Sequence, residues 1–265
     1  MPRRPIGMFD SGVGGLTVMQ QVSHALPRES MVYFGDTARV PYGGKSRETI
    51  IRYSIEGTIF LMEHDIKAMI IACNTASAYA RDKLRQLFNI PIIDVIEPGA
   101  EKAVQVTQNG CIGVLGTRAT IRSGMYEAEI KARLPSAQVI SIPCPLFVPL
   151  VEEHFTQHEA ARMIVREYLS PLKGTKVDTV LLGCTHYPLL RTIIEKELGE
   201  SIQIVDPAIA CAEKVSKLLQ QKKMQTDSKH STKRYFVSDD AAKFRQLGES
   251  FLGVSLEEVK QINSL

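Results

Sequence analysis

The chain has 265 residues, of which 44% are hydrophobic and 23% are charged, and its formal net charge is +3. This composition is ordinary for a globular protein and excludes collagen-like, disordered and disulfide-dense classes. The apolar runs fall far short of the ~18–20 residues that a membrane-spanning helix needs. We therefore expect no membrane partner, and one large domain or two small ones.

The N-terminus lacks the apolar run of about 7–15 residues that a signal peptide requires, because Gly7, Asp10 and Gly12 interrupt it. We therefore expect a cytoplasmic protein whose cysteines are reduced. There are five cysteines, and an odd number in a chain of this length argues against a disulfide scaffold.

Short runs rich in Ile, Val and Met recur along the chain, which is typical of strands buried on both faces. Segments with helical spacing separate several of them, as at 49–63, 162–172 and 189–198. This alternation predicts an α/β fold of right-handed βαβ units around parallel sheets. The predicted strands are 6–10, 31–35, 68–72, 92–96, 112–116, 138–142, 177–182 and 202–205.

The two halves of the sequence resemble each other weakly. Segment 6–11 is similar to segment 112–117, and the apolar runs that end at Cys73 and Cys184 are similar as well. All βαβ proteins share such runs, but the matched cysteines favour a duplication. We therefore expect two pseudo-symmetric α/β domains, each with a parallel sheet, that face one interdomain cleft with the active site.

Ligands of open α/β sheets bind beyond the carboxyl ends of the strands. Four polar side chains follow predicted strands: Asp10, Cys73, Cys184 and Asp206. Both of these cysteines are predicted to stand at or just before a helix N-terminus, where the helix dipole favours a thiolate. The cysteines without polar neighbours of this kind are predicted to be packing residues: Cys111, Cys144 and Cys211.

Two turns could approach a ligand. Glycines in segment 10–15 permit a tight strand-to-helix turn, although the segment is not GxGxxG and has no Walker lysine. An acid would repel a phosphate, so Asp10 is better suited to orienting a thiol or receiving an ammonium group. The turn at 41–44 could close over a ligand, or it could be a plain surface turn.

Positive charge is concentrated at 214–234, which holds seven basic side chains and one acid, Asp227. Segment 220–233 is polar and without periodicity, so we predict a solvated loop. A nucleic-acid-binding tail is the alternative, but no aromatic residues are interleaved with the charges. We therefore expect no nucleic-acid partner.

Other chemistries could use some of the same residues. A thiol hydrolase or transferase could use Cys184 and His186, but it would leave Cys73 unexplained. No metal site is expected, because the Cys and His spacings do not match a structural zinc site. A pyridoxal-phosphate enzyme would need a Schiff-base lysine and a phosphate cradle, and no lysine has such surroundings. A non-catalytic binding module is a further alternative.

Five motifs together resemble the cofactor-independent glutamate racemases of the aspartate/glutamate racemase superfamily. Their order and spacing fit from residue 9 to residue 206, whereas the region from about residue 222 adds little. The motifs are FDSGVGGLT at 9–17, GDTA at 35–38 with PYG at 41–43, ACNTASA at 72–78, CPLFVPLVE at 144–152 and LGCTHYPL at 182–189.

The resemblance implies that glutamate is racemised without a cofactor. Two acid/base groups must stand on opposite faces of a planar, carbanion-like intermediate, one as a thiolate and the other as a thiol. By family analogy, Cys73 takes the proton from D-glutamate and Cys184 takes it from L-glutamate. The implied product, D-glutamate, feeds bacterial peptidoglycan synthesis. We also expect a homodimer.

The resemblance also assigns residues that assist the two cysteines, and it implies a domain layout. Asp10 would assist Cys73, His186 would assist Cys184, and Glu152 would tune His186. The first domain would be discontinuous, with residues 1–97 and 208–265, and the second would be 98–207, with helices starting near Pro98 and Pro207. The family's substrate-binding positions correspond to Asp10, Ser11, Tyr42, Gly43, Asn74, Thr75, Thr117, Thr185 and His186. Helix N-caps are also plausible among them: Ser11, Thr75 and Thr185.

Overall fold

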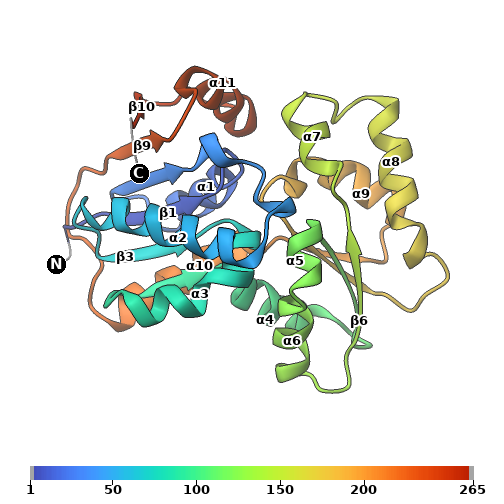
Figure 1. The fold of residues 1–265 in the computed structure, drawn as a ribbon. Helices are drawn as coiled ribbons and strands as arrows, with labels where there is room; N and C mark the ends of the chain where they lie inside the picture. Colours follow the sequence, from blue (N-terminus) through green and yellow to red (C-terminus); the bar gives the residue numbers. More distant parts are fainter. Residues whose placement is uncertain (1–2, 263–265) are drawn as a thin grey trace.

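The computed structural model describes residues 3–262, which fold around two parallel sheets (Figure 1). The larger sheet has the strand order β10-β9-β2-β1-β3-β4, and the smaller has the order β6-β5-β7-β8. The predicted α/β class with two parallel sheets is confirmed. The strands are β1 (Ile6–Asp10), β2 (Met31–Gly35), β3 (Ala68–Ile71), β4 (Ile92–Asp94), β5 (Cys111–Gly116), β6 (Gln138–Pro143), β7 (Thr179–Gly183), β8 (Gln203–Val205), β9 (Lys233–Val237) and β10 (Val259–Gln261).

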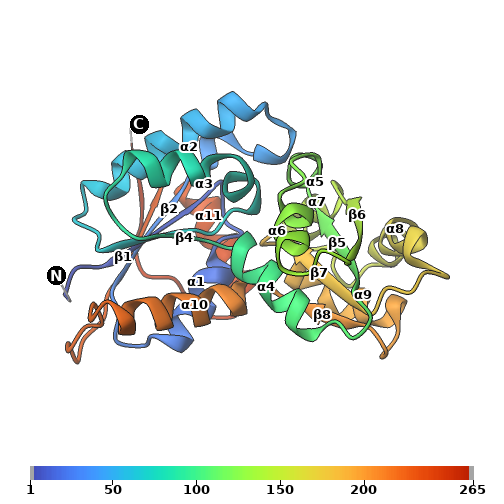
Figure 2. The ribbon, with the colours of Figure 1, turned by 90° about the horizontal axis from the view of Figure 1, so that it is seen from below.

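Helices cover both faces of each sheet. In Figure 2, α2 and α3 lie on one side of the larger sheet, with α1 and α10 on the other. Successive side chains of a strand therefore enter different cores: Met8 packs with α1 and α10, and Phe9 packs with α2 and α3. The α-helices are α1 (Leu16–Ala25), α2 (Arg47–Met62), α3 (Asn74–Leu87), α4 (Ile96–Val106), α5 (Arg118–Arg122), α6 (Met125–Arg133), α7 (Phe147–Glu152), α8 (Glu159–Leu169), α9 (Arg191–Leu198), α10 (Pro207–Gln221) and α11 (Ala241–Leu252).

The chain passes from the larger sheet to the smaller one through α4 and returns through α10. Helix α4 begins at Ile96, two residues before the predicted start at Pro98, whereas α10 begins at Pro207 as predicted. Asp206 caps α10, because its Oδ1 accepts a hydrogen bond from the backbone N–H of Ala208 at 2.9 Å. The proposed domain boundaries after residues 97 and 207 stay predictions.

The C-terminal part of the larger sheet was not predicted. Strand β9 pairs with β2 and β10 pairs with β9, so both extend the edge of the sheet. Because they are only partly buried, they lack the continuous apolar runs of the central strands. The predicted loop before β9 is mostly exposed and begins after α10 ends at Gln221. Among the described helices, none has the length and apolarity to cross a membrane.

Candidate active site

The turn after β1 buries a carboxylate beside several glycines. Asp10 is only 1% exposed, and its Oδ2 accepts a hydrogen bond from the N–H of Gly12 at 2.9 Å. A Cβ on Gly15 would lie 2.5 Å from the Cβ of Asp10, so this position requires glycine. Burial raises the pKa of Asp10. Its buried Oδ1 has no hydrogen-bond partner within residues 3–262, so an acceptor there is left unused.

Cys73 stands between β3 and α3, at the helix N-terminus as predicted, and it is also the N-cap of α3. Its sulfur accepts a hydrogen bond from the N–H of Ala76 at 3.4 Å and lies 3.5 Å from Ser11 Oγ. Burial, followed by the charge of Asp10, raises the pKa of Cys73 to about 12, although the bonds to Ser11 and Ala76 oppose this rise. Cys73 is therefore a protonated thiol at neutral pH in this structure.

Cys184 follows β7 and belongs to a line of three polar side chains. Its sulfur lies 3.9 Å from His186 Nδ1, and His186 Nε2 lies 2.9 Å from Glu152 Oε1. Burial lowers the pKa of His186, but hydrogen bonds with Cys184 and Glu152 outweigh it and raise the pKa to about 10. Burial opposes ionisation of Glu152, yet the bond to His186 holds its pKa below the usual value. The histidine is therefore an imidazolium at neutral pH.

The helix predicted directly after Cys184 is only partly right. A short 3₁₀ helix, Tyr187–Leu190, follows, and α9 begins later at Arg191. Pro188 occupies the first turn of the 3₁₀ helix, where no backbone donor is needed. The positive charge beside Cys184 therefore comes from His186 rather than from the terminus of a long helix.

The turns after β1 and β7 are in direct contact, which joins the two halves of the site. Thr17 Oγ1 donates a hydrogen bond to the carbonyl of Thr185 at 3.0 Å. A Cβ on Gly14 would lie 2.2 Å from Thr185 Oγ1 and 2.5 Å from His186 Nδ1. Charge on Cys184 also contributes to the raised pKa of Cys73. The two thiols, predicted from opposite halves of the sequence, are thus electrostatically coupled.

The predicted substrate-binding residues also meet across the two halves. Thr75 and Thr117 have hydroxyl oxygens 3.0 Å apart, and both contact the hydroxyl of Thr120. Asn74 Oδ1 accepts a hydrogen bond from the hydroxyl of Tyr126 at 2.6 Å. Thr120 and Tyr126 were missed because neither stands at a strand end. Thr120 reaches the site through the helix cap at Thr117 and the contact with Thr75, and Tyr126 reaches it through Asn74.

The turn at 41–44 forms a 3₁₀ helix, Tyr42–Gly44. A Cβ on Gly43 would lie 2.8 Å from Thr117 Cβ, so the turn packs against the other half of the molecule. The Tyr42 hydroxyl donates a hydrogen bond to the buried carboxylate of Asp36. Asp36 therefore holds Tyr42 in place. The sequence signal for this contact was that Asp36 belongs to the GDTA motif.

The suggested helix caps are wrong at all three positions. Helix α1 has Gly15 at its N-cap, α3 has Cys73, and the 3₁₀ helix after β7 has His186. Thr117 is a cap instead, because its hydroxyl accepts a hydrogen bond from Thr120 N. The three remaining cysteines are free thiols buried in the hydrophobic cores, as predicted: Cys111, Cys144 and Cys211.

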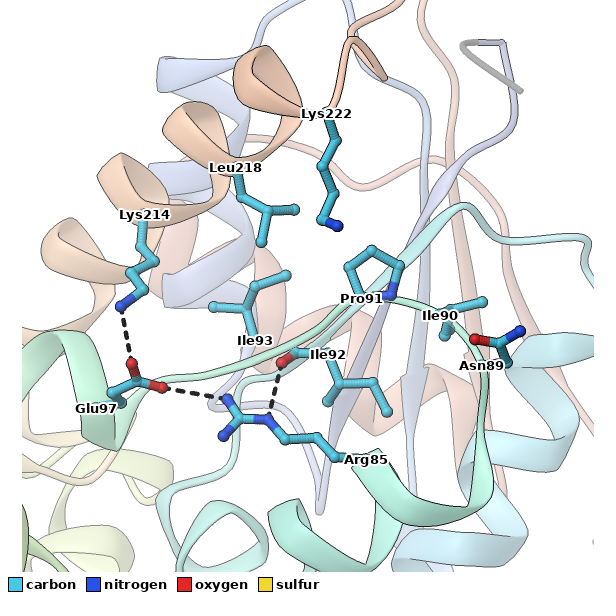
Figure 3. A pocket seen from close by; sticks show the side chains of 10 residues that line it. All are labelled: Arg85, Asn89, Ile90, Pro91, Ile92, Ile93, Glu97, Lys214, Leu218 and Lys222. Carbon is cyan, nitrogen blue, oxygen red and sulfur yellow. Dashed lines mark hydrogen bonds and ion pairs between the residues drawn. The ribbon is translucent and has the colours of Figure 1, made fainter.

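A cavity of about 510 Å³ lies away from these residues (Figure 3). It is formed by α3, β4, α4 and α10, and Glu97 forms ion pairs there with Lys214 at 2.8 Å and Arg85 at 3.2 Å. None of the predicted catalytic or substrate-binding side chains lines it. The residues predicted for catalysis and substrate binding therefore lie outside this cavity.

The chain is similar to racemases along its whole length. A model of the Asp/Glu/Hydantoin racemase family matches residues 6–215. The glutamate racemase of Geobacter metallireducens is 49% identical over 264 residues, which cover 99% of this chain and 98% of that protein.

Solved structures agree with this similarity. A glutamate racemase isoform from Bacillus anthracis has a TM-score of 0.97 at 38% identity, with 99% of this chain and 98% of that chain covered. The Francisella tularensis glutamate racemase, crystallised with D-glutamate, has a TM-score of 0.94 at 38% identity and the same coverage. The chain therefore belongs to the Asp/Glu/hydantoin racemase family. It is a racemase.

Proposed function

We propose that this racemase interconverts L-glutamate and D-glutamate without a cofactor, with Cys73 and Cys184 as the acid/base pair. The observation that carries the proposal is the pair of buried thiols, Cys73 and Cys184, each at the carboxyl end of a parallel strand of a different sheet. The full-length similarity to glutamate racemases, one of them crystallised with D-glutamate, supports glutamate as the substrate.

The surroundings of the two thiols favour different roles. With L-glutamate bound, Cys184 as a thiolate takes the α-proton, and Cys73 delivers its own proton to the opposite face of the carbon. The high pKa of Cys73 suits it to start as the acid. His186, 3.9 Å from the Cys184 sulfur, can stabilise its negative charge or exchange a proton with it. The reaction in the other direction reverses these roles.

The remaining polar groups are proposed to bind the substrate between the two halves. The free Oδ1 of Asp10 is an acceptor for the substrate ammonium group. Hydroxyl, amide and backbone groups would hold the carboxylates and the charge that develops on the intermediate. These groups belong to Ser11, Tyr42, Gly43, Asn74, Thr75, Thr117 and Thr185.

The geometry also favours one second candidate, a thiol hydrolase or transferase. Such enzymes place a nucleophile next to a base, and the base next to an acid. The same order is seen here in Cys184, His186 and Glu152. In that reaction Cys73 would have no role, although Asp10 and Ser11 surround it closely. The two functions therefore differ in their dependence on Cys73.

The test is incubation with each glutamate enantiomer in D2O without added cofactor, followed by NMR of the α-proton and by polarimetry. We expect the wild type to racemise glutamate, and Cys73→Ser and Cys184→Ser each to lose about 100-fold or more of this activity. The double variant should show no racemisation. Cys111→Ala, a change at a packing cysteine, is the control and should keep the activity. Racemisation by the double variant would overturn the mechanism, and a wild type that leaves both glutamate enantiomers untouched would favour the hydrolase.

We further propose that the D-glutamate supplies peptidoglycan synthesis. The expected cytoplasmic location and homodimer stay predictions. Expression in a bacterium that requires added D-glutamate tests the supply: growth without D-glutamate is expected with the wild type and not with the double cysteine variant.

A further inference from the structure

Helix α11 of the larger-sheet half reaches the histidine of the smaller-sheet half. The ring of Phe251 lies 5.7 Å from the ring of His186, with an angle of 81° between the two planes. Phe251 is partly buried and packs against hydrophobic cores on both sides of the contact. It belongs to the C-terminal region, which showed little resemblance to the family motifs.

The position of α11 is fixed by the half to which it belongs. A Cβ on Gly248 would lie 2.6 Å from Leu16 Cδ1, so the helix packs closely on α1. The ring of Phe244 lies 5.7 Å from Tyr33, and the Tyr33 hydroxyl donates a hydrogen bond to the carbonyl of Gly12 at 2.7 Å. The helix that presents Phe251 is therefore tied to the turn that also holds Asp10.

A second group of contacts links α11 with the segment that carries Glu152. Ser250 Oγ lies 3.4 Å from Nδ1 of His154, two residues beyond the end of α7. The charge of Lys243, also on α11, contributes to the lowered pKa of Glu152. Helix α11 therefore acts on both members of the histidine–glutamate pair.

The imidazole of His186 is consequently enclosed by groups from both halves. Its Nδ1 contacts Cys184 and Thr185, and its Nε2 contacts Glu152, all from its own half. The backbone of Gly14 and the ring of Phe251 approach it from the other half. These three hydrogen-bonding partners fix the nitrogens, and packing by an apolar ring limits rotation of the imidazole and access of water to it.

We propose that Phe251 is a positioning residue that holds His186 in line between Glu152 and Cys184. The inference rests on the proposed function, because it assigns Phe251 to the proton transfer at Cys184 and not to the transfer at Cys73. A change at Phe251 should therefore slow one of the two proton transfers selectively.

The test compares Phe251→Ala with Leu252→Ala, its neighbour on α11, which packs against the core of the larger-sheet half. We expect Phe251→Ala to lower kcat by about 10- to 100-fold and Leu252→Ala to lower it by less than about threefold, with both variants folded by circular dichroism. Phe251→Tyr keeps the ring and should restore most of the activity. If Phe251→Ala does not fold, Phe251→Leu replaces it.

Isotope effects distinguish positioning from a general loss of structure. Because the two enantiomers are equally stable, kcat/KM must stay equal in the two directions, and rates alone cannot assign the slowed step. With α-deuterated L-glutamate, the carbon–deuterium bond breaks at Cys184, so its isotope effect on kcat/KM should increase in Phe251→Ala. With α-deuterated D-glutamate, the bond breaks at Cys73, and the isotope effect should decrease.

The outcomes separate the inference from the proposed function. Wild-type protein that does not racemise glutamate would remove the proposed function and the inference together. Normal wild-type racemisation with isotope effects that are unchanged in the Phe251 variant would overturn the positioning role alone.

Discussion

Gly14 is the residue at which backbone from one half comes closest to the imidazole of the other. A side chain there would overlap Thr185 and His186, whereas a Cβ on Gly44 would have no atom within 4 Å. Neither glycine is among those with positive φ. The two positions therefore differ mainly in the space around them.

We predict that Gly14→Ala lowers kcat by about 100-fold, because a shift of about 1 Å in His186 is enough for such a loss. Gly44→Ala should stay within about threefold of the wild type. Steady-state racemisation assays, with thermal unfolding to confirm the fold, measure both. Equal activities of the two variants would contradict the assigned close contact.

Glu152 and His186 should also make stability depend on pH. The folded-state pKa of His186, about 10, is above its ordinary value of 6.5, so the stabilisation is complete below pH 6.5 and is lost as the pH rises through 10. Glu152→Gln removes the charged partner and should cost about 1.5–3 kcal/mol near pH 6.5.

Urea unfolding at pH 6.5, 8 and 10 measures this difference. The gap in free energy of unfolding between wild type and Glu152→Gln should narrow toward pH 10. A gap that widens over this range would contradict the imidazolium state of His186.

At the scale of elements, the segment between α10 and β9 is anchored by a buried ion pair. Lys67 and Glu29 have side chains only 0% and 3% exposed. Lys67 Nζ donates to the carbonyl of Met224 at 2.8 Å, and Glu29 Oε1 accepts from the N–H of Thr226 at 2.9 Å. The polar segment predicted as a solvated loop is thus fixed at its centre, which guides the chain into β9.

We predict that Glu29→Ala destabilises the protein by about 3–5 kcal/mol, because the buried ammonium group of Lys67 loses the carboxylate that neutralises it. Glu127→Ala breaks the exposed pair with Lys131 and should cost about 0.5 kcal/mol or less. Urea unfolding gives both values. A loss of under 1 kcal/mol for Glu29→Ala would show that the ion pair does not hold the segment.

At the scale of the whole molecule, α4 and α10 are the two connections between the sheets, and they touch each other. A Cβ on Gly99 would lie 2.9 Å from the Cβ of Pro207. Ion pairs reinforce this region, since Lys214 on α10 binds Glu97 on α4, as Figure 3 shows. Arg81 on α3 also binds Glu129 on α6, which spans the two halves directly.

We predict that Gly99→Ala destabilises the protein by about 1–3 kcal/mol, because the rigid proline ring cannot yield to the added methyl group. The shift between α4 and α10 should also lower kcat, although Gly99 is not among the proposed site residues. Unfolding and racemisation assays on the same preparation test both effects. Unchanged stability and activity would show that α4 and α10 can move apart at Gly99 and Pro207 without a cost.

Much of the fold could be predicted because its signals are local. The buried run of β1 and the place of Cys73 at the start of α3 depend on neighbouring residues. Strand β9 was not predicted, because a partly buried strand near the sheet edge lacks the continuous apolar run of the central strands. The resemblance, rather than spacing, suggested that Glu152 tunes His186, since 34 positions separate them.

The amino-acid pattern by itself determined the two sets of parallel strands, the turn at Asp10 and the placement of two cysteines after buried strands, because hydrophobic periodicity and capping act over a few residues. Tertiary packing decided the rest. It placed Gly14 and Phe251 against His186 and joined Thr75 to Thr117. Such contacts depend on how the two halves meet, and no short stretch of sequence encodes that geometry.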